Sequence, residues 1–259
     1  MEKSLYLQYI KMAVRRIQAG TPWERKRLIE KGQKFAKGFS PKGDARVTAW
    51  PCFESGEIIV VPVPERIFEY AFTVEMCMTH GILGKKVLDV GSSGSILPGI
   101  VAGLGNKVTC IDVREWPVQV KNLEFKKCDL LDCDIPKGSF DAVTCVSTVE
   151  HIGLGRYGDM EDPDGDIKGV ALLMEHLKPG GMLILTAPFG KAGIAYPAHR
   201  IYDRGRFDRL VAGYEPVEVR FHAPVDQQNV YRPCTEEETL KIDTAKTMGN
   251  VCALLRKKG

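Results

Sequence analysis

The sequence contains no long apolar run, no cysteines in a C-x-x-C spacing, no internal repeat and no low-complexity tract. Its longest apolar candidates, residues 58–63 and 182–187, have the length of a strand. A membrane-spanning helix needs about 20 apolar residues. The first residues also lack the apolar core of a signal peptide. We therefore expect neither a membrane span nor a secretory leader.

The composition is that of an ordinary globular chain. The 259 residues are 44% hydrophobic and 27% charged, with 26 glycines and 15 prolines. These values exclude collagen-like, disordered and disulfide-scaffold proteins. A chain of this length forms one large domain, or one domain with an appendage, and buries enough surface to fold without cross-links.

The eight cysteines are scattered along the chain, and Cys110 and Cys145 lie inside apolar runs. A free thiol in such a run behaves as a small hydrophobic group. We therefore predict reduced, buried cysteines and a cytoplasmic protein. Cys77 and His80 have a spacing found in metal sites, but no second pair accompanies them, so no metal is predicted.

The formal net charge of +3 is unevenly distributed. Residues 1–46 contain 12 Lys and Arg against 4 Asp and Glu, a balance of +8. Residues 47–259 contain 24 against 29, a balance of −5. The basic segment could meet nucleic acid or an anionic surface, or could be the solvated side of two helices.

The first 84 residues are predicted to be a helical extension that covers the substrate. Apolar residues recur at three- and four-residue spacing over residues 6–17, and a capping box at Thr21 opens a second helix. Residues 58–63 predict an edge strand or an extended segment bounded by prolines. Residues 65–80 have helical spacing.

From residue 85 onward, short apolar runs alternate with helical or loop segments. Strands that are buried on both faces of a parallel sheet read as unbroken apolar runs. The pattern therefore predicts an α/β domain over residues 85–259, with a doubly wound, mostly parallel sheet covered by helices. The apolar runs are 87–90, 108–113, 140–146, 182–187, 217–221 and 251–255.

The first of these runs leads into a Gly-rich turn, V-L-D-V-G-S-S-G-S at residues 87–95. Gly91 and Gly94 allow a sharp turn and the close approach of a ligand to the backbone. A helix is expected to begin near Ile96, and its unpaired N–H groups and positive dipole end suit a carboxylate or a phosphate.

Three further features accompany the turn. Asp112 ends the next apolar strand, 21 residues after the first glycine, where an acidic group can accept both hydroxyls of a ribose. Asp129 follows a third predicted strand at 125–128, at a position suited to an adenine amine. The L-K-P-G-G segment at 177–181 forms a turn that feeds a central strand.

Together these features resemble the class I S-adenosylmethionine-dependent methyltransferases, over about residues 85–190 and more loosely over 200–259. The resemblance implies a seven-stranded sheet in the order 3-2-1-4-5-7-6, with an insertion at about 223–250 that could cover the active site. The family's G-x-G-x-G is imperfect here, because Ser93 and Ser95 replace two glycines. A dinucleotide-binding enzyme would need G-x-G-x-x-G, which the turn does not match.

The resemblance implies a site for S-adenosylmethionine. Gly91 and Gly94 would lie against its methionine moiety, and Asp89 would help to hold its amino group. Asp112 would accept the ribose hydroxyls, and Asp129 with the backbone of Leu130 would hold the adenine. The complete implied set is Asp89, Gly91, Ser92, Gly94, Asp112, Val113, Asp129, Leu130 and Ser147.

The segment after the strand at 140–146 should face the transferable methyl group, because ligands of open α/β sheets lie beyond the carboxyl ends of the strands. It lacks the N/D-P-P-Y/F of amino-methylating enzymes and resembles a methyltransferase-like branch with E-H-I-G-L-G-R-Y-G-D, here at 150–159. His151 is the predicted general base, since its unperturbed pKa is about 6.5. Glu150 would orient His151 or act in its place. The structural alternative is that His151 packs under the loop and hydrogen bonds to a carbonyl.

The connection from Ser147 to about Asp166 is longer than a simple loop and predicts a lid or a substrate-binding loop. Its D-P-D-G-D stretch lacks the later glutamate of a calcium loop, so Asp166 is expected to cap a helix. The predicted substrate-contacting residues are Arg156, Tyr157, Arg200 and Tyr202.

The sequence thus predicts an enzyme that methylates a hydroxyl or similar nucleophile of a small molecule or a saccharide. One alternative is a nucleic-acid (RNA) methyltransferase that uses the basic residues 1–46 as its electrostatic foothold. The other is a non-catalytic S-adenosylmethionine-binding protein. The acceptor atom and the oligomeric state do not follow from the sequence.

Overall fold

The computed structural model describes residues 53–54, 57–58, 65–116, 119–195, 198–225, 230–244 and 247–258. The chain divides into two compact units, Met1–Val61 and Pro62–Gly259. In the first unit, β1 (Phe53–Glu54) and β2 (Glu57–Ile58) form a two-stranded antiparallel sheet. The helices predicted within residues 1–46 lie outside the described residues, as does all but the first residue of the strand predicted at 58–63.

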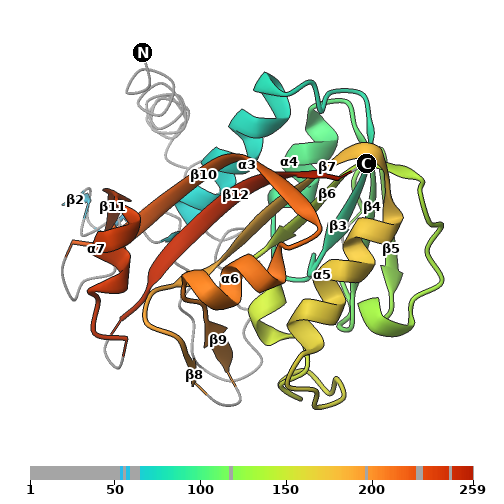
Figure 1. The fold of residues 1–259 in the computed structure, drawn as a ribbon. Coiled ribbons are helices and arrows are strands. Elements are labelled where there is room, and N and C mark those ends of the chain that lie inside the picture. The colour runs from blue at the N-terminus through green and yellow to red at the C-terminus, as the bar shows by residue number, and fades with distance from the viewer. Residues whose placement is uncertain are drawn as a thin grey trace. The chain divides into compact units, whose positions relative to one another are not determined.

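The second unit is built on an eight-stranded sheet in the order β11-β10-β12-β7-β6-β3-β4-β5 (Figure 1). Neighbouring strands from β5 through β7 are parallel, whereas β12, β10 and β11 pair antiparallel with their neighbours. The strands are β3 (Lys86–Val90), β4 (Lys107–Asp112), β5 (Leu123–Lys127), β6 (Phe140–Val146), β7 (Leu177–Phe189), β10 (Tyr214–Pro224), β11 (Tyr231–Cys234) and β12 (Gly249–Lys257).

This sheet confirms the predicted fold class and adds one strand. Counted in chain order without β11, the strands run 3-2-1-4-5-7-6, as the resemblance implied. The additional strand, β11, comes from the predicted insertion at 223–250 and pairs with the end of β10.

Helices cover both faces of the sheet, which is why its central strands are mostly apolar. In β6, every side chain except that of Asp141 is buried. Figure 1 shows α3 and α4 on one face and α5 and α6 on the other. None of the described helices is long and apolar enough to cross a membrane. The remaining elements are α3 (Glu65–Thr79), α4 (Leu97–Gly103), η1 (Leu130–Asp132), η2 (Val149–His151), α5 (Gly165–His176), β8 (Gly193–Ala195), β9 (His199–Ile201), α6 (Arg204–Leu210) and α7 (Glu236–Leu240).

Helix α3 confirms the helix predicted over residues 65–80, and it belongs to the same compact unit as the sheet. The sequence-based boundary at residue 84 had placed it in the N-terminal extension instead. Its buried side chains recur at three- and four-residue spacing, so that one face packs inward. These side chains are Glu69, Phe72, Thr73, Met76 and Cys77.

The cysteines differ from the prediction at one place. Cys128 and Cys133 form a disulfide, because the η1 turn between them brings their Cα atoms to 5.5 Å. The prediction of reduced cysteines is therefore wrong for this pair. The other five described cysteines are free, and all of them except Cys234 are buried.

A buried carboxylate joins α5, β9 and α6. Asp166 lies within the first turn of α5, fully buried, rather than at the helix cap. It accepts hydrogen bonds from Arg206 at 2.7 Å and from the hydroxyl of Tyr202 at 3.0 Å, and Nε of Arg200 lies 3.8 Å away. Arg200 also donates to the carbonyl of Ile152, so the same cluster holds the base of the loop that follows β6.

We predict that Asp166→Ala lowers the free energy of unfolding by about 3–5 kcal/mol, because it leaves buried guanidinium groups without their counterion. Denaturant-induced unfolding followed by circular dichroism measures this loss. Asp164→Ala is the matched control, since Asp164 is exposed and its side chain makes no capping hydrogen bond. Equal losses in the two variants would contradict a central role for Asp166.

Candidate active site

The Gly-rich turn joins β3 to α4 and lies against the segment that follows β6. Gly91 and Gly94 have φ values of 84° and 85°, a conformation that other residues rarely adopt. A Cβ atom at Gly91 would lie 2.1 Å from the hydroxyl oxygen of Thr148. Glycine is therefore required at position 91 for the turn to contact the neighbouring loop.

Asp89 holds this turn together from inside. Its side chain is buried, and its Oδ1 and Oδ2 atoms accept hydrogen bonds from the hydroxyls of Ser92 and Thr144, each at 2.6 Å. Burial raises the pKa of Asp89 to about 6. The geometry gives Asp89 a role in ordering the turn, and its contact with a cofactor amino group stays a prediction.

Asp112 ends β4 beside the turn, and its carboxylate is fully occupied. The backbone N–H groups of Ser93 and Arg114 donate to it at 2.9 and 2.8 Å. The guanidinium of Arg114 donates to Oδ1 at 3.0 Å and to Oδ2 at 3.1 Å. A carboxylate offers about four lone-pair positions. The Arg114 side chain therefore takes one position on each oxygen, the two that a vicinal diol would need.

Asp129 lies at the end of the neighbouring strand, β5, and caps the η1 turn. Its Oδ1 atom accepts a hydrogen bond from the backbone N–H of Leu131 at 2.9 Å. The disulfide of Cys128 and Cys133 closes the turn around it. The structure thus brings Asp112 and Asp129 to the carboxyl ends of adjacent parallel strands, as predicted.

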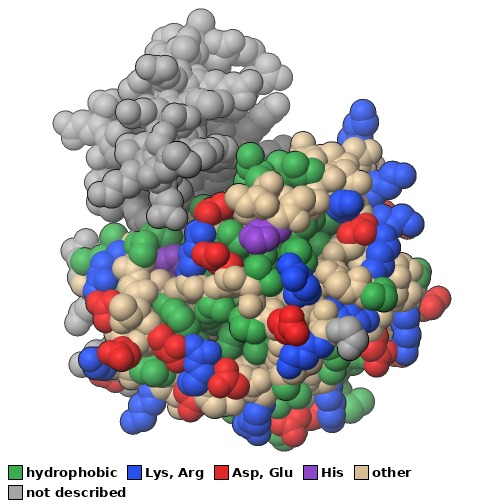
Figure 2. Space-filling view, turned by 45° about the horizontal axis from the view of Figure 1, so that its top comes forward, with side chains coloured by type: hydrophobic (Ala, Val, Ile, Leu, Met, Phe, Trp, Pro, Cys, Tyr) green, Lys and Arg blue, Asp and Glu red, His purple; other side chains and the backbone are tan. Residues whose placement is uncertain are grey.

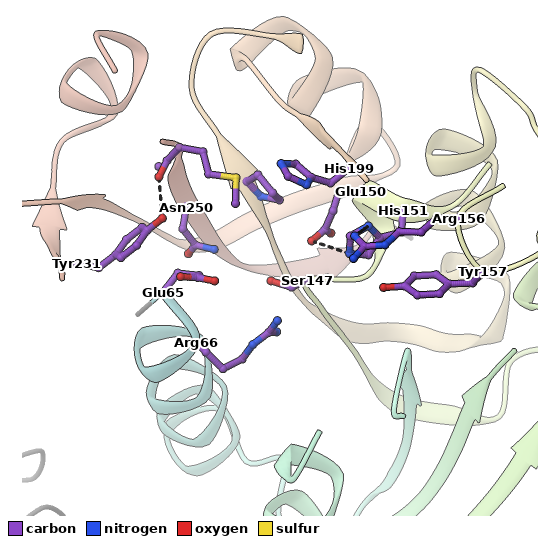
Figure 3. A pocket seen from close by; sticks show the side chains of 13 residues that line it. Glu65, Arg66, Ser147, Glu150, His151, Arg156, Tyr157, His199, Tyr231 and Asn250 are labelled. Carbon is purple, nitrogen blue, oxygen red and sulfur yellow. Dashed lines mark hydrogen bonds and ion pairs between the residues drawn. The ribbon is translucent and has the colours of Figure 1, made fainter. Parts of the chain in front are cut away.

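A cavity of about 280 Å³ lies beyond the carboxyl ends of β6 and β7 (Figure 3). It brings together five of the predicted site residues, namely Ser147, Glu150, His151, Arg156 and Tyr157. Eight further lining residues were not singled out from the sequence, although four of them lie in the insertion predicted at 223–250. They are Glu65, Arg66, Pro188, His199, Tyr231, Met248, Gly249 and Asn250.

The side chain of Glu69 from α3 organises the floor of this cavity. Glu69 is fully buried, and its Oε1 atom accepts hydrogen bonds from Ser147, Thr186 and Asn250 at 2.5, 2.7 and 2.9 Å. Its Oε2 atom forms an ion pair with Arg66 at 3.0 Å. Ser147 has a φ of 43°, a strained conformation for a residue other than glycine. Glu69 therefore fixes a strained residue at the end of β6.

Glu150 and His151 face the cavity from the η2 turn. Nδ1 of His151 lies 2.5 Å from the carbonyl oxygen of Ala198, so Nδ1 carries the proton and Nε2 has a free lone pair. Nε2 lies 3.7 Å from Oε1 of Glu150. Burial lowers the pKa of His151 to about 4 and raises that of Glu150 to about 8. The Oε2 atom of Glu150 is buried and has no hydrogen-bond partner among the described residues.

Arg200 and Tyr202, which were predicted to contact the substrate, lie away from the cavity. Their side chains are 1% and 0% exposed and belong to the Asp166 cluster. Neither residue lines the cavity. The reason is the direction of β9, which turns both side chains toward α5 instead of toward the carboxyl ends of the strands.

Comparison with known proteins places this architecture among methyltransferases. The chain is 33% identical over 118 residues to a ubiquinone biosynthesis O-methyltransferase of Idiomarina loihiensis, which covers 42% of this chain and 44% of the relative. A ubiquinone biosynthesis O-methyltransferase of Xanthomonas oryzae pv. oryzae is 36% identical over 115 residues, or 40% and 44% of the two chains. The chain thus matches less than half the length of these curated relatives.

Solved structures show the same fold. One is a Burkholderia thailandensis 1,6-didemethyltoxoflavin-N1-methyltransferase with bound 1,6-didemethyltoxoflavin and S-adenosylhomocysteine. It has a TM-score of 0.56 and 16% sequence identity, and the alignment covers 74% of this chain and 78% of the Burkholderia chain. A SAM-dependent methyltransferase of Methanosarcina mazei has a TM-score of 0.50 and 16% sequence identity. The alignment covers 70% of this chain and 96% of the Methanosarcina chain. The chain therefore has the fold of class I S-adenosylmethionine-dependent methyltransferases. Residues 122–249 also match a family described as Caenorhabditis protein of unknown function, DUF268.

We predict that Glu150→Gln stabilises the protein above pH 5. In the wild type, folding holds the Glu150 carboxyl neutral up to about pH 8, whereas the unfolded chain ionises it near pH 4.5. The native state therefore loses stability as the pH rises from about 4.5 to 8, a loss on the order of 3 kcal/mol at pH 7. Glutamine does not titrate. Urea unfolding should show that Glu150→Gln is more stable than the wild type at pH 8 but not at pH 4. An equal difference in stability at both pH values would contradict the raised pKa of Glu150.

Proposed function

We propose that this chain is an S-adenosylmethionine-dependent methyltransferase that methylates a hydroxyl of a small, polar molecule such as a saccharide. The observation that carries the proposal is the position of the cavity. It opens beyond β6 and β7, beside the Gly-rich turn, while Asp112 and Asp129 lie at the ends of the strands on the other side of that turn. A cofactor site and an acceptor site would therefore meet at the turn.

The residues around the turn suit this cofactor. Gly91 and Gly94 would admit its amino-acid moiety, and Asp129 with the backbone of Leu130 would hold its adenine. The Arg114 side chain is 45% exposed and can move into solvent. Its departure would free one lone pair on each oxygen of Asp112, which is the pattern that the two ribose hydroxyls need. Ser92, Val113 and Ser147 would border the same site.

The Glu150–His151 pair would accept the proton of the acceptor hydroxyl. S-adenosylmethionine supplies a methyl group on a sulfonium, and the acceptor oxygen must approach that methyl with its proton removed or leaving. The carbonyl of Ala198 fixes the His151 ring so that Nε2 faces Glu150 and the cavity. Because the two groups are neighbours, they would share the proton and titrate as a pair.

The lining of the cavity favours a polar acceptor. Pro188 and Met248 are the aliphatic side chains among the described lining residues, and the others carry hydrogen-bonding or charged groups or lack a side chain. The names of the curated relatives refer to ubiquinone biosynthesis. A long apolar acceptor would leave many of the polar groups in this cavity without partners, at a cost of about 1–3 kcal/mol for each.

The rival proposals have less support. On the face shown in Figure 2, Lys and Arg side chains are interspersed with Asp and Glu. A protein surface that binds nucleic acid instead has Lys and Arg clustered in a positively charged patch. The basic residues 1–46, on which that alternative rests, lie outside the described residues.

A non-catalytic binding protein would bind S-adenosylmethionine without methylating any acceptor. A cytoplasmic location stays a prediction.

Binding of S-adenosylhomocysteine, measured by calorimetry, tests the cofactor site. We expect Asp112→Ala to lower the affinity at least tenfold, because the ribose loses its acceptor. Arg114→Gln should raise the affinity about two- to fivefold, since it removes a half-exposed competitor for the same oxygens. Arg209→Gln on the exposed part of α6 is the control. Unchanged affinity in Asp112→Ala would overturn the cofactor assignment.

The pH dependence of methyl transfer tests the proton acceptor. With an ionised Glu150–His151 pair as the base, kcat/KM should rise with pH to a plateau above about pH 8, following the raised pKa of Glu150. Glu150→Gln should remove this rise, and His151→Ala should lower kcat while cofactor affinity is kept. An unaltered profile in Glu150→Gln, or full activity in His151→Ala, would contradict these roles.

A further inference from the structure

The cavity contains two guanidinium groups with different surroundings. Arg66 forms an ion pair with the buried Glu69 at 3.0 Å, so a neighbouring carboxylate neutralises its charge. Arg156 forms no salt bridge with any carboxylate in the described part of the chain. Its Nη1 atom donates to the carbonyl of Ala198 at 2.9 Å and lies 3.4 Å from Nδ1 of His151.

The titratable side chains that line the cavity next to Arg156 do not balance its charge at neutral pH. Burial lowers the pKa of His151 to about 4 and also lowers that of His199, so both rings are neutral. Burial raises the pKa of Glu150 to about 8, so this carboxyl is mostly protonated at pH 7. In Figure 3, Glu65 lies on the other side of the cavity from Arg156. The part of the cavity beside Glu150 and His151 therefore has a positive charge.

The guanidinium of Arg156 is held in place and still has donors to offer. It packs over the ring of Tyr157 at 5.1 Å, and that ring meets His151 edge-on at 5.6 Å. One N–H group is used by the carbonyl of Ala198, and the side chain is otherwise exposed toward the cavity. A guanidinium has five N–H donors in a planar fork, which matches the two oxygens of a carboxylate or phosphate.

We propose that the acceptor is a compact, hydroxylated anion, whose carboxylate or phosphate is bound by Arg156 while its reacting hydroxyl lies at Glu150 and His151. This inference rests on the proposed function and adds the chemical class of the substrate. The short distance from Arg156 to His151 requires the anionic group and the hydroxyl to lie within a few bonds of each other, as in a sugar acid, a sugar phosphate or a small hydroxy acid. A cationic amine would be repelled from the same place.

The test uses sets of compounds that share one hydroxylated skeleton and differ in the charged group that it carries. Glucose, glucuronate, glucose 6-phosphate and glucosamine form one set, and glycerol, glycerate and glycerol 3-phosphate form another. Binding to the 259-residue chain saturated with S-adenosylhomocysteine is measured by calorimetry, and methyl transfer is measured with labelled S-adenosylmethionine. We expect an anionic member to bind at least tenfold more tightly than its neutral partner, and the carboxylate and phosphate compounds to show which anion is preferred.

Variants assign the preference to one side chain. Arg156→Gln should abolish the preference for the anion and leave the affinity for S-adenosylhomocysteine unchanged, while Arg156→Lys should keep part of it. Arg209→Gln should change neither. The inference is overturned if no anionic member binds, if a neutral or cationic member binds best, or if Arg156→Gln keeps the preference. Failure of the wild-type protein to bind S-adenosylhomocysteine would instead reject the proposed function itself.

Discussion

The buried carboxylate of Glu69 is the contact on which the geometry of the site depends. A carboxylate without exposure to water is costly unless donors surround it. Glu69 has such donors from three strands, through Ser147, Thr186 and Asn250, together with Arg66 from its own helix. These contacts attach helix α3 to the ends of β6, β7 and β12 beneath the cavity.

A second buried carboxyl, that of Glu150, has fewer polar partners than Glu69. Its Oε2 atom has no hydrogen-bond partner and no ion pair in the described part of the chain, and burial raises its pKa. Under the proposed function, two buried glutamates near one cavity would thus have different roles: Glu69 holds the fold, and Glu150 exchanges a proton. Such a division, set by environment and not by residue type, is common where proteins build acid–base sites.

The sheet could be predicted from the sequence because strands buried on two faces read as unbroken apolar runs, and the Gly-rich turn marked where it begins. The loop after β6 could be predicted to face the site, but the full lining of the cavity could not, because the rest of it comes from segments far apart in the chain, such as α3 and β9. Polarity near a strand end suggested Arg200, but the sequence does not give the direction of a side chain. The acid within the apolar stripe of α3, Glu69, was a visible signal for a buried network.

Tyr157 connects the two halves of the site. Its ring lies 4.6 Å from the guanidinium of Arg114, which occupies Asp112, and 5.1 Å from that of Arg156 in the cavity. Each cation–π contact contributes about 0.5–1 kcal/mol at an exposed position. A movement of Arg114 away from Asp112 changes one of the two contacts that hold this ring, and the ring in turn packs against His151. Tyr157 thus contacts both the guanidinium that occupies Asp112 at the end of β4 and the wall of the cavity beyond β6.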